Sequence, residues 1–241
     1  MVQKVLSIII PAYNEAMHIG SLIKLVADTK MQLPVKKEII IVDDGSTDGT
    51  FDIASDYAKQ YNDQKIILLQ NKINKGKGSA VRKGLEHASG DIVLIQDADL
   101  EYDPSEYDEL IQPIIDDHAD VVYGSRFIGS KPQRKLYFWH NAGNKFITFL
   151  SNLLTGLNLT DIETCFKAFN TTILKSISLH ENRFGFEPEV TAKISRIKAV
   201  RIYEIGIAYH GRTYQDGKKV KWHDGLWAIW CIIKYNVWKR R

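Results

Sequence analysis

The 241-residue sequence is poor in cysteine and has no long apolar run. Its only cysteines, Cys165 and Cys231, form no CxxC pair, which excludes a disulfide scaffold, a structural zinc site and a thioredoxin-like redox motif. The longest apolar run, residues 226–233, falls well short of the ~18 residues that span a bilayer. Another run, at residues 5–10, is too short for the core of a signal peptide. We therefore expect a cytoplasmic protein that does not cross a membrane.

Two common nucleotide-binding motifs are also absent. The chain has no GxGxxG sequence, which argues against nicotinamide chemistry, and no GxxxxGKS or GxxxxGKT loop. A lysine- and glycine-rich segment at residues 75–78 instead precedes an expected helix, where backbone N–H groups favour anions. Hydrophobic residues make up 44% and charged residues 25%, values typical of a soluble globular protein, so a disordered chain is excluded.

Positive charge is concentrated at the C-terminal end. Residues 201–241 contain nine Lys and Arg against three Asp and Glu, whereas the remainder contains 23 basic and 26 acidic residues. This asymmetry indicates an anionic partner, such as phosphate groups, a lipid surface or nucleic acid. A solvated basic face is the alternative interpretation.

Short apolar runs alternate with segments of helical spacing over the first 100 residues. We predict strands at 5–10, 38–42, 65–69 and 91–96, and helices at 15–30, 52–61 and 79–88. Continuous apolar strands separated by helices indicate an α/β fold with a Rossmann-like, mostly parallel sheet flanked by helices. Beyond residue 105 we predict helices at 106–115 and 144–154, strands at 121–123 and 200–207, a polar loop at 127–139, and further elements at 163–174 and 187–197.

Three polar clusters, at residues 11–15, 43–49 and 96–101, come directly after predicted strands. Right-handed crossovers place the carboxyl ends of parallel strands at one edge of the sheet, where open α/β sheets bind ligands. We therefore expect the three clusters to meet at one crevice. This acidic grouping does not fit a nucleic-acid binder.

The acidic residues of these clusters predict a metal–nucleotide site. Asp97 and Asp99 end a strand and Glu101 follows, a set of hard oxygen ligands that suits Mg²⁺ or Mn²⁺. The alternative is that the two aspartates cap the next turn. Asp43 and Asp44 are adjacent acids that repel each other, and a nucleobase imide or ribose hydroxyl would justify one of them.

With these residues in place, the chain resembles a known enzyme family. PAYNE at 11–15, VDDGSTDGT at 42–50, NKGKGSAVRKG at 74–84 and QDADLEYDP at 96–104 are similar to the inverting family-2 glycosyltransferases of the GT-A fold. GSR at 124–126, DIETCFK at 161–167, FGFE at 184–187, and GRTY at 211–214 with GKK at 217–219 resemble the dolichyl-phosphate mannose synthase branch. That branch transfers a hexose from a nucleotide sugar to a polyprenyl phosphate.

The resemblance implies a role for each matching position. Asp99, Arg126 and Arg212 would be the catalytic residues, and Asp99 and Glu101 would hold the Mg²⁺ or Mn²⁺ ion. Arg126, His140, Asn144 and Lys167 would bind the acceptor phosphate, although the branch commonly has Arg and Ser in place of His140 and Asn144. The nucleotide sugar would contact Pro11, Ala12, Tyr13, Glu15, Asp44, Lys77, Asp97, Ala98, Asp99, Arg212 and Lys218.

The chemistry of the acceptor separates two functions. A phosphate monoester has a second pKa of about 6 and is a nucleophile at pH 7 without a protein base. Transfer to a polyprenyl or dolichyl monophosphate then needs cations around a departing diphosphate, as the metal, Arg126, Arg212 and Lys218 would provide. The alternative, a family-2 enzyme acting on a saccharide or protein hydroxyl, requires a base, for which Asp161, Glu163, Glu187 and His210 are candidates. The donor, of GDP-mannose or UDP-glucose type, stays open.

The C-terminal segment has the pattern of an amphipathic helix. Trp222, Leu226, Ile229, Trp230, Ile233 and Val237 fall within a stripe of about 100° at helical spacing. Tryptophan beside terminal basic residues is typical of a helix lying on anionic lipid, and packing of the stripe on the enzyme body is the alternative. We expect one catalytic domain peripheral to the cytoplasmic membrane face, with a nucleotide-sugar half (1–104), an acceptor half (105–221) and a tail helix (222–241).

Overall fold

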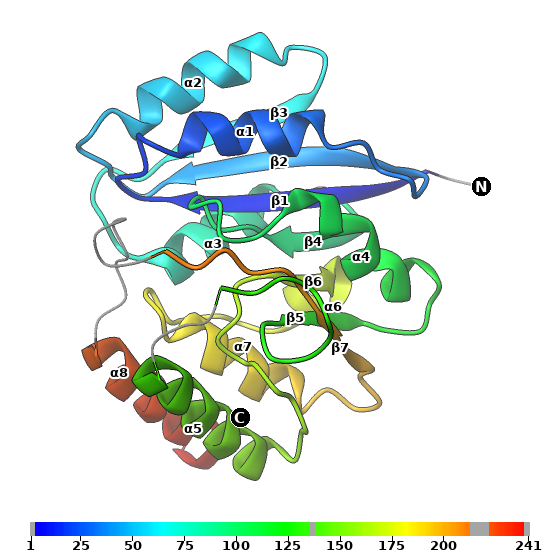
Figure 1. The fold of residues 1–241 in the computed structure, drawn as a ribbon, viewed down its shortest axis with the longest axis vertical. Coiled ribbons are helices and arrows are strands. Elements are labelled where there is room, and N and C mark those ends of the chain that lie inside the picture. The colour runs from blue at the N-terminus through cyan, green and yellow to red at the C-terminus, as the bar shows by residue number, and fades with distance from the viewer. Residues whose placement is uncertain (1–2, 135–137, 213–221, 239–241) are drawn as a thin grey trace.

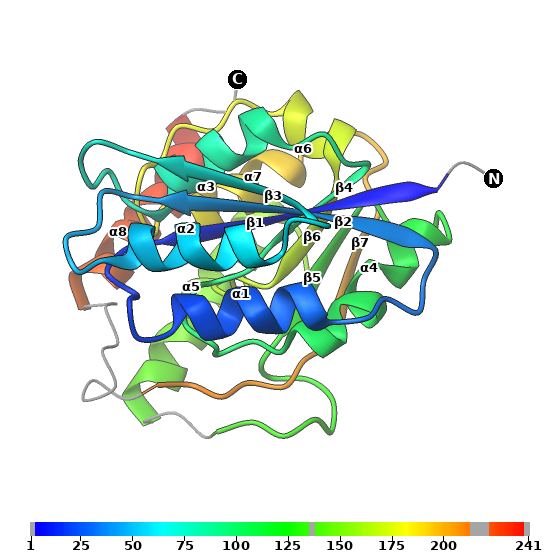
Figure 2. The same ribbon diagram turned by 90° about the horizontal axis from the view of Figure 1, so that it is seen from above.

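The computed structural model describes residues 3–134, 138–212 and 222–238. Within these ranges one seven-stranded sheet, in the order β3-β2-β1-β4-β6-β5-β7, runs through the molecule with helices on both faces (Figures 1 and 2). The strands are β1 (Lys4–Ala12), β2 (Val35–Asp43), β3 (Lys65–Gln70), β4 (Ile92–Ile95), β5 (Val121–Ser125), β6 (Lys167–Asn170) and β7 (Ile202–Gly206). The helices are α1 (Ile19–Asp28), α2 (Thr50–Gln60), α3 (Lys77–His87), α4 (Tyr107–Ile115), α5 (Phe138–Thr155), α6 (Thr171–Ser176), α7 (Phe186–Ile194) and α8 (Trp222–Ile233). A 3₁₀ turn, η1 (Pro104–Glu106), precedes α4, and a π-helical segment, η2 (Lys234–Trp238), extends α8.

The sheet is mostly parallel, as the sequence predicts. β1 pairs in parallel with β2 and β4, β2 with β3, and β5 with β7, whereas β6 runs antiparallel to both β4 and β5. The α/β class with a mostly parallel, helix-flanked sheet is confirmed. The reversed strand β6 falls in the segment 163–174, where the apolar pattern was too short to give a direction.

Both faces of the sheet are buried. Ile8, Ile9 and Ile10 are successive residues of β1, so their side chains alternate between faces, and each is fully inaccessible to solvent. One face carries α1, α2 and α4, and the other carries α3, α5, α6, α7 and α8. Burying an isoleucine contributes roughly 1.5–3 kcal/mol. The continuous apolar strands therefore require helices on both sides.

Two predicted boundaries differ from the structure for identifiable reasons. The first helix begins at Ile19 rather than residue 15, because Asn14 has a left-handed φ of 48° and the carbonyl of Glu15 instead closes a turn with the N–H groups of His18 and Ile19. Helix α5 begins at Phe138 rather than residue 144, so the last two residues of the loop predicted at 127–139 are helical. Their aromatic side chains are exposed, which removed the buried periodicity on which the prediction depended.

Glu181 connects helix α8 and the following segment η2 to the rest of the molecule. Its carboxylate accepts hydrogen bonds from Trp227 Nε1 (3.1 Å), Lys234 Nζ (2.6 Å) and Tyr235 Oη (2.7 Å). The buried side of α8 consists of Ala228, Cys231 and Ile232. The predicted stripe therefore points largely outward, with Trp222 77%, Leu226 58% and Trp230 42% exposed.

An acidic side chain is buried where β1, β2 and β3 begin. Glu38 accepts hydrogen bonds from Ser7 Oγ (2.5 Å) and from the N–H (2.9 Å) and hydroxyl (2.7 Å) of Ser89, and it forms an ion pair with Lys65. Burial alone would raise the pKa of Glu38, but these donors outweigh it and lower the pKa to about 2. The charged form of Glu38 is thus part of the folded structure.

Candidate active site

The three polar clusters meet at the carboxyl edge of the sheet. β1 and β2 are aligned so that Ala12 lies opposite Asp43, and β4 pairs with the other side of β1, which brings their following loops together. Asn14 joins two of these loops, since its N–H donates to Ser46 Oγ (2.9 Å) and its side-chain oxygen accepts from the N–H of Thr47 (2.9 Å). Pro11 and Ala12 end β1, and Tyr13 is 36% exposed beside them.

Asp44 organises the loop that leads into α3. Its carboxylate accepts from Asn71 Nδ2 (2.7 Å) and from the N–H groups of Lys75 (3.0 Å) and Gly76 (2.5 Å). Gly76 has a φ of 100°, and a Cβ there would lie 2.5 Å from the carbonyl oxygen of Asn182, so only glycine fits. The reading of a nucleobase by Asp44 stays a prediction. Its neighbour Asp43 has a buried carboxylate oxygen, Oδ1, without a hydrogen-bond partner in the described part of the chain.

Arg212 brings together three acidic residues from different parts of the sequence. Its guanidinium contacts Asp99 Oδ2 (2.9 Å) and both carboxylate oxygens of Glu15 (3.2 and 3.3 Å). Its backbone N–H donates to Glu101 Oε1 (2.7 Å), and Tyr209 Oη donates to Glu101 Oε2 (2.8 Å). Four of the positions that the sequence assigned to donor and metal binding, Glu15, Asp99, Glu101 and Arg212, therefore lie together.

This group of carboxylates fits a divalent cation. Burial and the neighbouring charges of Asp97 and Glu101 raise the pKa of Asp99 to about 7, although Arg212 opposes the shift. Three acids around one cation indicate that this location requires positive charge. The described residues contain no group of three or more His, Cys, Asp or Glu side chains arranged to hold a metal by themselves. That finding is compatible with Mg²⁺, which is commonly held by one or two carboxylates together with substrate phosphates.

A second ion-pair chain lies beside the first. Lys77, the first residue of α3, places its Nζ 2.9 Å from Asp97 Oδ1 and 2.9 Å from Glu187 Oε1, and it also contacts the thiol of Cys165. Burial would raise the pKa of Asp97, but Lys77 outweighs it and lowers the pKa. Ala98, between Asp97 and Asp99, is buried. Lys77 therefore links the end of β4 to the start of α7.

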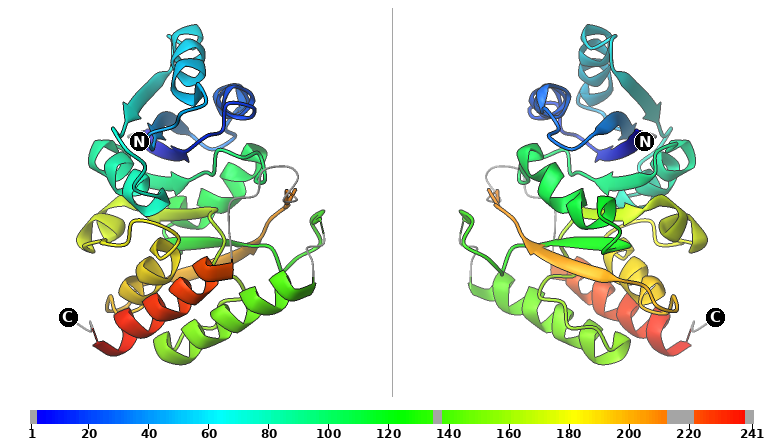
Figure 3. Two further views of the ribbon diagram at one scale, coloured as in Figure 1. Left: turned by 90° about the vertical axis from the view of Figure 1, so that its left-hand side faces the viewer. Right: turned by 90° about the vertical axis from the view of Figure 1, so that its right-hand side faces the viewer.

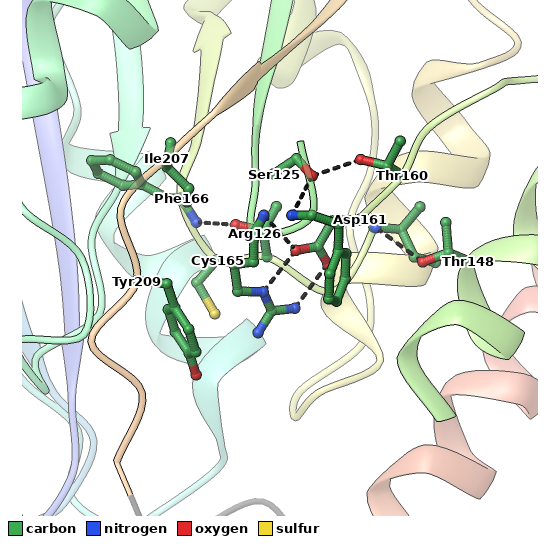
Figure 4. A network of polar contacts seen from close by, with 12 residues as sticks. Ser125, Arg126, Thr148, Thr160, Asp161, Cys165, Phe166, Ile207 and Tyr209 are labelled. Atoms are coloured by element: carbon green, nitrogen blue, oxygen red, sulfur yellow. Dashed lines mark hydrogen bonds and ion pairs between the residues drawn. The ribbon is translucent and has the colours of Figure 1, made fainter. Parts of the chain in front are cut away.

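Arg126 follows β5 and is held by a buried acid (Figure 4). Its Nε and Nη2 contact Asp161 Oδ2 (2.7 Å) and Oδ1 (2.8 Å), and its backbone N–H also reaches Asp161 Oδ2 (3.2 Å). The guanidinium lies 5.3 Å from the ring centre of Tyr209, a cation–π contact. Asp161 is fully buried and engaged on both oxygens, so it positions Arg126. Phe127, Ser125 and Thr160 complete the polar network.

The other predicted acceptor residues are less closely grouped. Lys167 is fully buried, donates to the carbonyl of Thr164 and lies 5.1 Å from the ring centre of Tyr123. His140 and Asn144 lie one turn apart near the start of α5. Contacts of these three residues with an acceptor phosphate stay predictions. Lys218 lies outside the described residues.

Sequence reasoning missed the part played by Tyr209. This residue donates to Glu101 and lies against the guanidinium of Arg126, so it connects the group of acids around Arg212 with Arg126. It lies after β7 in an irregular segment that pairs with Gln133, and no spacing rule marks it. The sequence marks Glu163 and Glu187 as candidate bases for a hydroxyl acceptor. It does not predict that Lys77 contacts Glu187 or that Lys167 lies near both acids.

Comparison with known proteins agrees with this geometry. A model of the family described as glycosyl transferase family 2 matches residues 7–178. The chain is 33% identical over 191 residues to the UDP-N-acetylglucosamine–dolichyl-phosphate N-acetylglucosaminyltransferase of Methanococcus voltae. The alignment covers 74% of this chain and 74% of that relative. It is 28% identical to the dodecaprenyl-phosphate galacturonate synthase of Rhizobium johnstonii, over 88% of this chain and 61% of the relative. It is 27% identical to the undecaprenyl-phosphate 4-deoxy-4-formamido-L-arabinose transferase of Aeromonas hydrophila, over 89% of this chain and 63% of the relative.

The chain thus spans less than two thirds of the length of the latter two relatives. Among solved structures, glucosyl-3-phosphoglycerate synthase from Mycobacterium tuberculosis, in complex with Mn²⁺, UDP and phosphoglyceric acid, superposes with a TM-score of 0.71. The superposition covers 97% of this chain and 79% of that one at 18% identity. At this identity the likeness establishes the fold alone.

Proposed function

Because the chain belongs to glycosyl transferase family 2, we propose that it transfers a sugar from a nucleotide sugar to a polyprenyl or dolichyl monophosphate, with inversion at the anomeric carbon. The observation that carries this proposal is the convergence of Asp99, Glu101 and Glu15 on Arg212. With a divalent cation bound to the acids, a site of this kind would suit the diphosphate of a donor. The relatives act on dolichyl, dodecaprenyl and undecaprenyl phosphates, which supports the acceptor class.

Residues 1–104, together with Arg212, would form the donor side, and the rest of residues 105–221 would form the acceptor side. Tyr13 and Glu15 lie where the nucleoside would enter the crevice, and Arg212 would turn from the carboxylates toward the donor diphosphate. Arg126, fixed by Asp161, would bind the acceptor phosphate. Because that phosphate is already a nucleophile at pH 7, these residues need only orient two anions and offset their repulsion.

Asp99 and Glu101 would hold a divalent ion, Mg²⁺ or Mn²⁺, together with donor phosphate oxygens. When bound, such an ion supplies positive charge to the departing nucleoside diphosphate. Tyr209 and the N–H of Arg212 orient Glu101, and Arg212 balances the charge of Asp99. The acids are therefore arranged for a cation before it arrives.

The sugar itself is not fixed by the relatives. Their names contain three different sugars, N-acetylglucosamine, galacturonate and a formamido-arabinose, although the three proteins are similar in sequence to this chain. We propose a hexose donor of GDP-mannose or UDP-glucose type, on the resemblance of the segments 124–126 and 184–187 to the mannose synthase branch.

An apolar surface made by α5, α8 and η2 supports association with a membrane. The two helices lie side by side on the outer side of the molecule (Figures 1 and 3). No helix in the described residues is long and apolar enough to cross a bilayer. We define the α5–α8 surface by its exposed apolar residues, which are Phe138, Trp139, Phe146, Phe149, Leu153, Trp222, Leu226, Trp227, Trp230, Val237 and Trp238. Exposed aromatic side chains, in a chain whose C-terminal sequence is basic, are typical of a protein bound peripherally to anionic lipid. In that position the enzyme would meet an acceptor phosphate that is attached to a lipid.

One observation favours the alternative acceptor, a saccharide or protein hydroxyl. Burial and the charge of Glu187 raise the pKa of Glu163 to about 8, although Lys167 and Arg126 oppose the shift, and its Oε1 has no hydrogen-bond partner in the described residues. A carboxylate with such a pKa is a suitable base for a hydroxyl. Asp161 is committed to Arg126, so Glu163 is the stronger candidate for this role.

A transfer assay tests the proposal. The protein is incubated with UDP-glucose, UDP-N-acetylglucosamine or GDP-mannose, with Mn²⁺ or Mg²⁺, and with a short polyprenyl phosphate. We expect a metal-dependent glycolipid with one donor. Turnover only when a sugar or peptide hydroxyl replaces the lipid phosphate would favour the alternative.

A further inference from the structure

Two buried carboxylate oxygens beside the donor site have no hydrogen-bond partner. Glu187 Oε2 and Glu163 Oε1 are both shielded from solvent and unpaired in the described part of the chain. Glu187 is only 2% exposed. An unpaired buried polar atom costs free energy, so native proteins retain few of them, and each one calls for an explanation.

The other oxygen of Glu187 shows where these atoms lie relative to the donor. Glu187 Oε1 and Asp97 Oδ1 bind the same Lys77 ammonium, each at 2.9 Å. Asp97 is two residues from Asp99, which contacts Arg212. Lys77 therefore holds the carboxylate of Glu187 close to Asp97 at the end of β4, with the second oxygen of Glu187 unpaired.

The charge of this cluster fits a neutral, hydroxyl-rich ligand. Lys77 and the buried Lys167 offset the charges of Asp97 and Glu187, and the raised pKa of Glu163 keeps its carboxyl protonated at neutral pH. The cluster thus presents an unpaired carboxylate oxygen of Glu187 and a carboxyl of Glu163 that both donates and accepts. Asp97, Glu163 and Cys165 are partly exposed, so the cluster is open to solvent on one side.

We propose that Glu187 and Glu163 bind hydroxyl groups of the sugar that is transferred, with Lys77 as the positioning residue for Glu187. Sugar hydroxyls are O–H donors, which an unpaired carboxylate oxygen requires. This assignment rests on the proposed function, since it places the donor diphosphate near Asp99. It makes these two acids determinants of sugar binding rather than of nucleotide binding.

Calorimetric titration separates the two kinds of binding. UDP, UDP-glucose, GDP and GDP-mannose are titrated in the presence of Mn²⁺ into the wild type, Glu187→Gln and Glu163→Leu. We expect each variant to bind the nucleotide sugar about 10-fold more weakly or worse, while the affinity for the matching nucleoside diphosphate stays within about 2-fold. Equal affinities of variant and wild type for the nucleotide sugar would overturn the inference.

Glu189 offers a matched control on the same helix. Its carboxylate is fully engaged by the N–H groups of His180 and Glu181 and by Lys193. Glu189→Gln should lower thermal stability without changing the ratio of the two affinities. If Glu187→Gln does not fold, Glu187→Asp, which keeps the charge but withdraws the carboxylate by one methylene, gives the same comparison. A wild type that binds no nucleotide at all would contradict the proposed function instead, and Glu163→Leu that loses turnover with unchanged sugar binding would make Glu163 a base.

Discussion

The guanidinium of Arg212 lies 2.9 Å from the carboxylate of Asp99, although 113 positions separate the two residues in the chain. Asp99 follows β4 and Arg212 follows β7, so the contact spans the sheet from the donor side to the segment after the last strand. Arg212 also contacts Glu15, which comes after β1. One cation thus balances acids from separate loops at the position where a metal and a diphosphate are proposed to bind.

Replacement of Arg212 should change metal binding and turnover in opposite directions. Arg212→Ala releases the carboxylates of Asp99 and Glu15 from their cation, so Mn²⁺ should bind the nucleotide-free protein about 10-fold more tightly. Transfer should fall by about 100-fold or more because a charge near the leaving diphosphate is lost. Electron paramagnetic resonance of free Mn²⁺ and the transfer assay give the two values. The control is Arg201→Ala, whose partners Asp117 and Asp120 lie elsewhere, and unchanged Mn²⁺ affinity in Arg212→Ala would contradict the account.

Arg126→Lys should weaken acceptor binding selectively. Lysine cannot reproduce the two parallel contacts that Arg126 makes with Asp161, so its charge would no longer be fixed in place. We expect the KM for polyprenyl phosphate to rise at least 10-fold while the KM for the nucleotide sugar changes little. Steady-state kinetics with each substrate varied in turn measure both values. A rise confined to the donor KM would place Arg126 on the other side of the reaction.

The α5–α8 surface should govern binding to lipid. Trp139 and Trp222 are 81% and 77% exposed, and changing both to glutamate introduces negative charge on this surface. Co-sedimentation with anionic vesicles should fall several-fold and should decrease with added salt in the wild type. Met17→Glu is the control, because Met17 is 88% exposed and belongs to the β1–α1 loop. Equal sedimentation of the double variant and the control would rule out this docking surface.

Glu38 should make the fold sensitive to acid. Its folded-state pKa of about 2 lies below the ordinary value of 4.5, so it stabilises the folded protein above pH 4.5, and this contribution is lost as the pH falls toward 2. Glu38→Gln should lower the free energy of unfolding at pH 7 by roughly 2 kcal/mol, equivalent to a Tm decrease of about 4–8 °C. Thermal melts at pH 7 and pH 3 should show a smaller difference between wild type and variant at pH 3. The exposed Glu86 supplies a control, and a difference independent of pH would refute the assigned pKa.

The first half of the fold could be predicted from the sequence because its signals are local. Ile8, Ile9 and Ile10 mark a strand buried on both faces, and the acids at 97–101 mark the end of another. Parallel topology then places Asp99 and Glu15 at one edge without further information. The family motifs added roles for these positions.

The second half of the fold depends on contacts between residues far apart in the chain, which no local pattern predicts. Tyr209 reaches Glu101 across 108 positions, and Lys77 reaches Glu187 from the opposite half of the chain. The reversed direction of β6 follows from its pairing with β4 and β5 rather than from its four residues. The outward orientation of Trp222 follows from the packing of Ala228 and Cys231, which form the buried side of α8 and which the apolar stripe does not include.

The nucleophile of the proposed reaction is a lipid phosphate. The need for the phosphate group of the acceptor can be measured directly. The wild-type protein is supplied with the donor it accepts and Mn²⁺, and the initial rate is compared for a polyprenyl phosphate and the polyprenol of the same chain length. The account predicts glycolipid from the phosphate at a rate at least 100-fold above that from the alcohol, with Asp99→Asn lowering it to background. Equal rates with the two acceptors, or transfer to the alcohol alone, would contradict it.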